Sequence, residues 1–147
     1  MRRAIVVALG TGAFISSAAA LSLNGAEEPR NVMTRGDYEI ALRGLEAARP
    51  ARLARCEALA AVDKDVCRTE AQARELVRVA EIEQDFRPSE QSARALQRAR
   101  IDARYQAERA RCGLQAGGFK REKCLVKAHA NRGRALLEAA APYETRF

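Results

Sequence analysis

Apolar side chains recur every three or four residues through most of the chain, and proline and glycine divide this pattern into four segments. The segments span residues 34 to about 60, 63 to 87, 89 to about 115, and about 120 to 141. This spacing places the apolar residues on one face of a helix. Ala, Arg, Glu and Leu dominate the segments, and all four are strong helix formers. The pattern therefore predicts an all-α fold with four helices.

Residues that cap or break helices stand at the predicted boundaries. Side chains of Ser, Thr and Asp accept hydrogen bonds from the first turn of a helix, and the N-cap candidates here are Thr34, Asp63 and Ser89. Pro50 lies inside the first segment, where its ring disfavours a helical residue before it and removes a backbone donor. We therefore expect a kink there, or one helix that ends near Ala48 and another that starts at Pro50.

The four cysteines occur as two pairs in a repeated sequence context. The pairs are Cys56 with Cys67 and Cys112 with Cys124. The repeat offset is 56 residues at the first cysteine and 57 from the second onward, which a loop one residue longer in the second copy explains. With this offset, Ala71 and Ala73 correspond to Ala128 and Ala130. We expect two helical hairpin repeats, over residues 34–87 and 88–147.

Each cysteine pair is placed to clamp its hairpin. The first cysteine lies about a turn before the end of one predicted helix, and the second about a turn after the start of the next. Helix axes normally lie 8–10 Å apart, whereas a disulfide needs Cα atoms at about 5.5–6 Å, so small neighbours such as Ala58 and Ala110 are required. We expect the disulfides Cys56–Cys67 and Cys112–Cys124. The alternative is a zinc site of four thiolates, but the close C-x₂₋₄-C pairs of structural zinc sites are absent from the sequence.

The packing of the two clamped hairpins has two solutions. The third predicted helix carries two apolar stripes, and a helix of this kind usually contacts two neighbours. A four-helix bundle satisfies this requirement, and so does an elongated helical array joined at Pro88. Aromatic residues make up only 5% of the chain and Trp is absent, so either arrangement has a thin core.

The N-terminus has the pattern of an export signal. Arg2 and Arg3 precede an uncharged run up to Leu23, and Ala18-Ala19-Ala20 offers the small residues that a signal peptidase requires. We expect residues 1–20 to be a cleaved signal peptide, residues 21–33 to be a flexible mature N-terminus, and the protein to be periplasmic. The alternative is an uncleaved anchor that holds a periplasmic spacer or scaffold at the inner membrane.

Positive charge is concentrated in the second half of the chain. The whole chain has a net charge of +7, and residues 88–147 alone contain 13 basic and 6 acidic side chains. The predicted surface for an anionic partner consists of Arg94, Arg98, Arg104, Lys120, Arg121, Lys123 and Lys127. Further arginines on the same helices are Arg100, Arg111, Arg132 and Arg134. In an envelope compartment the expected partner is an anionic envelope component or an acidic protein rather than nucleic acid. The alternative is that these are solvated helix faces.

No pattern in the chain indicates catalysis. His129 is the only histidine, and motifs such as G-x-S-x-G and H-E-x-x-H are absent. We therefore expect no cofactor and no enzyme activity. The expected function is noncovalent binding or a structural role in the cell envelope, and a metal-binding carrier is a further alternative.

The cysteine repeat resembles a known group of proteins. The segments that carry the resemblance are Ala54-Arg-Cys56 and Lys64-Asp-Val-Cys-Arg-Thr-Glu-Ala71. They are similar to small exported proteobacterial proteins with paired-cysteine, Ala/Lys-rich helical repeats, some of them labelled TolA-like envelope proteins. The resemblance covers about residues 35–140 and is weaker in the second copy, where Lys127 replaces the glutamate. It implies compartment and architecture, and no active site comes with it.

Overall fold

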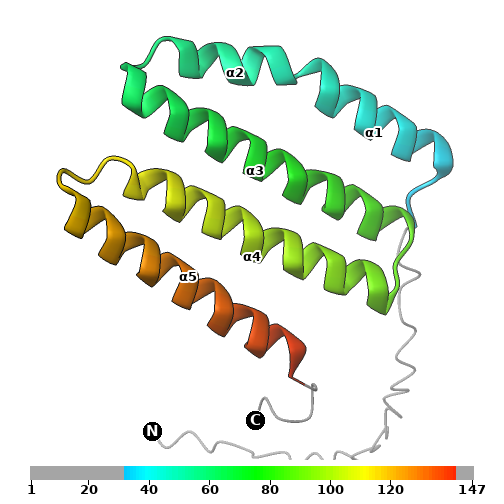
Figure 1. Ribbon diagram of the computed structural model, residues 1–147. Helices are drawn as coiled ribbons and strands as arrows, with labels where there is room; N and C mark the ends of the chain where they lie inside the picture. Colours follow the sequence, from blue (N-terminus) through cyan, green and yellow to red (C-terminus); the bar gives the residue numbers. More distant parts are fainter. Residues whose placement is uncertain (1–31, 142–147) are drawn as a thin grey trace, which may run out of the picture. The chain divides into compact units, whose positions relative to one another are not determined.

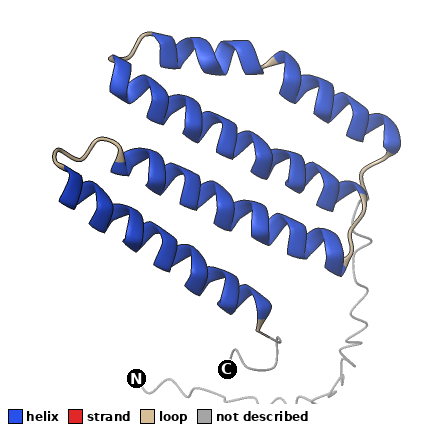
Figure 2. Ribbon diagram, in the orientation of Figure 1, coloured by secondary structure: helices blue, strands red, loops and turns tan. Residues whose placement is uncertain are grey.

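A computed structural model describes residues 32–141. Helices connected by short loops make up this part of the chain, and it contains no strand (Figure 2). The five helices are α1 (Arg35–Ala47), α2 (Arg49–Glu57), α3 (Ala61–Phe86), α4 (Glu90–Cys112) and α5 (Gly118–Ala140). The expected signal peptide and its cleavage site lie outside the described residues.

Local sequence explains most of the helix boundaries. Thr34 caps α1 by accepting a hydrogen bond from the backbone N–H of Asp37 at 3.2 Å. Ser89 caps α4 in a reciprocal capping box with Ser92. The break expected at Pro50 is confirmed, because α1 ends at Ala47 and α2 begins one residue before the proline.

The predicted N-cap at Asp63 is wrong. Helix α3 begins earlier, at Ala61, and its N-cap residue, Ala60, makes no side-chain capping bond. Asp63 instead lies within the first turn of the helix. An acidic side chain is favourable there because the exposed backbone N–H groups give the helix N-terminus a partial positive charge. Asp63 therefore stabilises the start of the helix from inside the first turn.

Contacts between helices follow the order of the chain. Helices α1 and α2 pack against α3, α3 packs against α4, and α4 packs against α5 (Figure 1). Within residues 32–141, α5 does not contact α3, and neither α1 nor α2 contacts α4. The fold class is therefore the expected one, all-α with two clamped hairpins, and the packing is that of the elongated helical array.

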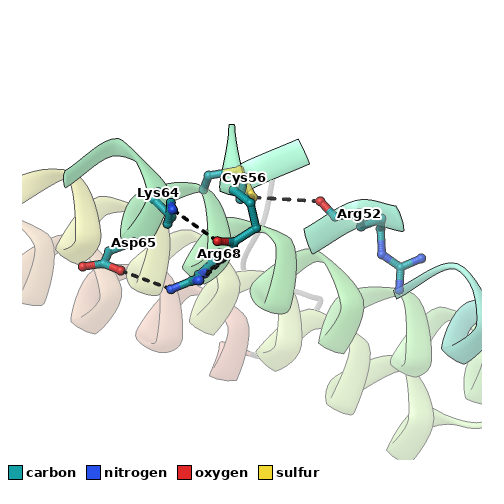
Figure 3. Close-up of polar contacts among 7 residues, drawn as sticks. Arg52, Cys56, Lys64, Asp65 and Arg68 are labelled. Atoms are coloured by element: carbon teal, nitrogen blue, oxygen red, sulfur yellow. Dashed lines mark hydrogen bonds and ion pairs between the residues drawn. A yellow bond between two sulfur atoms is a disulfide. The ribbon is translucent and has the colours of Figure 1, made fainter. Parts of the chain in front are cut away.

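Both expected disulfides are present. Cys56 is bonded to Cys67 and Cys112 to Cys124, each with a Cα–Cα distance of 5.5 Å. Each of the four sulfurs is bonded to its partner in one of these two disulfides, so none of them is available as a thiolate ligand for zinc. Beside the first disulfide, Glu57 accepts from Lys64 at 3.2 Å and pairs with Arg68, which joins α2 to α3 (Figure 3).

The core is thin and consists mostly of small side chains, with Ile82 and Tyr105 as the larger members. The buried residues of the described part are Cys56, Ala71, Ala73, Ile82, Tyr105, Cys112 and Ala128. Ala71 and Ala128 occupy equivalent positions in the two repeats and are 7% and 2% exposed. Each lies one turn after the second cysteine of its hairpin, where a larger side chain would separate the helices that the disulfide holds together.

Ion pairs between helices supplement this core. Glu75 of α3 is 13% exposed and pairs with Arg49 and Arg52 of α2. Arg52 also donates to the backbone oxygen of Leu45 at 2.8 Å, which ties α2 to α1. The hydrogen bond from Arg49 holds the pKa of Glu75 below its ordinary value. This carboxylate therefore stays ionised at neutral pH and joins α3 to α2.

Candidate binding surface

The seven residues of the predicted anionic-partner surface are all exposed, but they do not form one cluster. They divide between α4, which carries Arg94, Arg98 and Arg104, and the first half of α5, which carries Lys120, Arg121, Lys123 and Lys127. Arg94 pairs with Glu90 one turn earlier. Lys123 lies over the ring of Phe119, with 4.9 Å between Nζ and the ring centroid. Of the seven, Arg104 lines the groove described next.

That site is a groove between α4 and α5 with a volume of about 380 Å³. Tyr105 and Ile101 of α4 and Ala135 of α5 form part of its lining. The charged lining residues are Arg100, Arg104, Arg132, Arg134, Glu108 and Glu138. Four guanidinium groups thus surround one groove, and they outnumber its carboxylates.

Each of these arginines is positioned by one or more polar contacts with neighbouring side chains. Arg100 pairs with Glu81 of α3 at 3.1 Å, and Arg132 pairs with Asp102 of α4 at 2.7 Å. The other two contact partners on their own helices, Arg104 with Glu108 at 3.0 Å and Arg134 with the amide oxygen of Asn131 at 2.7 Å. A guanidinium has five N–H donors. These contacts fix the side chains and leave donors for a ligand.

Glu108 is the carboxylate set most firmly into the groove. Burial raises its pKa, but the hydrogen bonds from Asn131 and Arg104 outweigh burial and lower the pKa below its ordinary value. Glu108 is therefore ionised at neutral pH and neutralises part of the charge of Arg104. An anion that enters the groove must bind to the arginine donors that face away from this carboxylate.

Tyr105 and His129 close one side of the α4–α5 interface. Tyr105 is 9% exposed, and its hydroxyl lies 3.0 Å from Nε2 of His129. The guanidinium of Arg132 lies over the Tyr105 ring, 5.2 Å from its centroid. The single histidine is exposed, and its ring contacts a tyrosine of the neighbouring helix.

A second hollow, of about 460 Å³, lies between α2 and α3. It contains Arg49 and Arg52, but both pair with Glu75, which lines the same hollow. Its other lining residues include Leu53, Leu76 and Val79. One carboxylate thus pairs with both arginines of this hollow. The α4–α5 groove has four guanidinium groups, and we take it as the candidate anion site because a phosphate can contact more of them there.

Sequence analysis identifies only part of this groove. Arg104 belongs to the predicted surface, whereas Arg100, Arg132 and Arg134 lie outside it, as further basic residues of the same helices. The spacing of Arg100 and Arg104, four residues apart on one face of α4, is the sequence signal that groups Arg100 with Arg104. Arg132 and Arg134 join them only through the packing of α5 on α4.

Comparison of the chain with protein-family models, curated proteins and solved structures finds no match. Among residues 32–141, no helix has the length and apolar character needed to cross a bilayer. The same residues contain no cluster of three or more His, Cys, Asp or Glu side chains that could hold a metal ion. The two disulfides are compatible with a location outside the cytoplasm.

Proposed function

We propose that this protein is exported to the periplasm and binds a phosphate-bearing component of the cell envelope noncovalently, without catalysis. The observation that carries the proposal is the α4–α5 groove with its four arginines. A guanidinium presents parallel N–H donors that match two oxygens of one phosphate, and its charge does not depend on pH in the ordinary range.

The disulfides support the proposed compartment. Disulfides form and persist in oxidising compartments such as the periplasm and are rare in the cytosol. In this fold the disulfides are part of the core, because Cys56 and Cys112 are each only 1% exposed. They occupy positions where a helical hairpin normally buries large apolar side chains. The signal-peptide pattern of residues 1–20 supports the same compartment.

The first test is an intact mass measurement on protein from its native host, with and without alkylation under nonreducing conditions. We expect the mass of residues 21–147 less four hydrogens, and no alkylation. Full-length protein with four alkylatable thiols would refute export and oxidation together. Full-length protein with no free thiol would instead indicate the anchored spacer.

The second test measures binding to phosphatidylglycerol vesicles by cosedimentation. The double variant R104Q/R134Q removes two groove charges while leaving the pairs of Arg100 and Arg132 in place. Each basic residue near an anionic surface contributes about 1 kcal/mol, so we expect about a tenfold or greater loss of affinity. The matched control is R94Q/R98Q, which removes the same charge outside the groove and should change affinity less than about threefold. Equal losses in the two variants would refute the groove as the site.

A further inference from the structure

Helix α5 carries an apolar stripe on the side that faces away from α4. The stripe, which we call the α5 outer stripe, consists of Phe119, Val126, Ala130, Gly133, Leu137 and Ala140. These residues follow one another at intervals of seven, four, three, four and three, so they share one helix face. All are exposed, and the exposed fractions of Phe119, Val126 and Leu137 are 71%, 63% and 74%.

The internal repeat shows what this face does when it has a neighbour. Helices α3 and α5 are the second helices of their hairpins and correspond at an offset of 57 residues. Ala71 and Ala128 are both buried, whereas Ala73 is 5% exposed and its equivalent, Ala130, lies open to solvent. Residues two positions apart in a helix lie on nearly opposite faces, so Ala71 and Ala73 face different neighbours. Glu70, one turn before Ala73 on the same side of α3, pairs with Arg111 of α4, so α4 covers this side of α3. Within the described residues α5 contacts only α4, and no helix covers the side of α5 that bears Ala130.

Charge at the edge of this face differs between the two helices near the start of the helix and is kept near its end. On α3, Glu70 pairs with Arg111 of α4 at 2.7 Å and Glu81 pairs with Arg100 at 3.1 Å. Lys127 stands at the position of Glu70 in the repeat, whereas Glu138 stands at the position of Glu81 and keeps its charge. The residues that correspond to Asp63, Val66 and Val77 of α3 are also basic, namely Lys120, Lys123 and Arg134. A helix that packs beside Lys120, Lys123 and Lys127 is therefore favoured if it carries a carboxylate where α4 carries Arg111.

We propose that the α5 outer stripe is the docking site for an acidic amphipathic helix of a partner protein, which adds to the array as α4 adds to α3. The partner helix presents a narrow apolar face to Val126, Ala130 and Leu137, and its Asp or Glu side chains flank that face. Ala130 and Gly133 allow the close approach that Ala73 allows in the α3–α4 pair.

A second copy of this chain is the poorer occupant. Packing α5 against α5 in parallel would bring Lys123 and Lys127 of one copy toward the same residues of the other, and like charges at such a contact oppose association. The antiparallel arrangement is decided by the sedimentation experiment below. The stripe is also separate from the α4–α5 groove, because none of its six residues lines the groove. The inference therefore goes beyond the proposed phosphate binding and can fail independently of it.

The test uses three synthetic helical peptides and fluorescence anisotropy with the disulfide-bonded protein. The first has an Ala/Leu stripe at heptad spacing with Glu flanks, the second has the same stripe with Lys flanks, and the third has the Glu composition in shuffled order. We expect the first to bind at least tenfold more tightly than either of the others. Equal binding of the shuffled peptide, or no binding of the first peptide at millimolar concentration, would overturn the proposal.

Matched variants locate the peptide on the protein. Leu137→Asp places a carboxylate on the outer stripe and should weaken binding of the Glu-flanked peptide at least tenfold. Ile40→Asp is the control, since Ile40 is 62% exposed on α1 and lies outside the stripe, and it should change binding less than twofold. Both substitutions are at exposed positions, so thermal melting verifies that the variants are folded. Equal effects of the two variants would overturn the proposal.

Sedimentation velocity on the peptide-free protein separates the partner from a second copy. A dimer that Leu137→Asp dissociates would assign the stripe to self-association and overturn the proposal. A monomer at the concentrations of the peptide experiment supports it. Vesicle binding should be unchanged in Leu137→Asp, so loss of peptide binding with vesicle binding intact distinguishes this site from the groove.

Discussion

Removing one disulfide should cost a large share of the stability of this protein. We consider the double variants C56A/C67A and C112A/C124A, in which Ala leaves no polar group at the buried cysteine positions. The bonded residues are 11 and 12 positions apart. In the chain-entropy treatment, closing a loop of this length stabilises the fold by about 3 kcal/mol. A small domain has a total stability of about 5–15 kcal/mol.

The thin core gives little to offset this loss. A change of 1 kcal/mol shifts the melting temperature of a domain of this size by about 4–8 °C, so each double variant should melt at least about 10 °C below wild type. Circular dichroism at 222 nm under nonreducing conditions measures the shift. The wild-type protein in excess dithiothreitol should melt lower still, because both clamps are then open.

Hydrogen exchange tests where each clamp acts. Helix α5 contacts only α4 within the described residues, so C112A/C124A should accelerate amide exchange in α5 while the exchange of α3 changes little. In C56A/C67A the acceleration should fall on α2. If both variants melted within about 2 °C of wild type, helix packing alone would hold the hairpins and the clamp reasoning would be wrong.

Two further substitutions test packing and charge. Ala73→Leu overfills the buried α3–α4 contact and should lower the free energy of unfolding by about 1–3 kcal/mol. The equivalent substitution Ala130→Leu is at an exposed position and should leave the free energy of unfolding within about 0.5 kcal/mol of wild type. Urea titration measures both. Glu75→Gln should cost about 1 kcal/mol at pH 7 because it weakens two arginine hydrogen bonds. The folded-state pKa of Glu75 is lowered, so its contribution to stability is present above the unfolded-state pKa and is lost as pH falls through the folded-state pKa. The difference in free energy of unfolding between wild type and variant should therefore shrink below about pH 4.

Clear results would contradict these two predictions. Equal destabilisation by Leu at positions 73 and 130 would mean that the two helix faces are equally covered. The α5 outer stripe would then not be free to bind a partner helix. For the charge prediction, Glu122→Gln is the control, because Glu122 is exposed on α5. A stability difference for Glu75→Gln that persists unchanged at pH 3 would show that the carboxylate charge contributes nothing.

The sequence predicts those features that depend on nearby residues. Helix segments, the break at Pro50 and both disulfides follow from local periodicity and from cysteines less than fifteen residues apart. The start of α3 was misplaced because Ala61 and Val62 carry no boundary signal, while Asp63 is favourable both as a cap and inside the first turn.

Features set by distant contacts were less accessible. The two apolar stripes of the third segment indicate two neighbours for α4 but do not say whether the first and last helices meet, because a stripe identifies a face and not its partner. The groove shows the same limit. Arg104 and Arg132 are 28 residues apart, and only the antiparallel packing of α5 on α4 brings them to one site.

The connectivity of the disulfides also bears on how the native bonds are reached. A chain that emerges from its N-terminus exposes Cys56 and Cys67 first, and they can react before Cys112 has appeared. Even with all four thiols present, Cys67 is 11 residues from Cys56 and 45 from Cys112. Loop-closure statistics then favour the native pair about eightfold. Oxidation therefore favours the native bonds, and only a minority of chains would need a later rearrangement of mispaired cysteines.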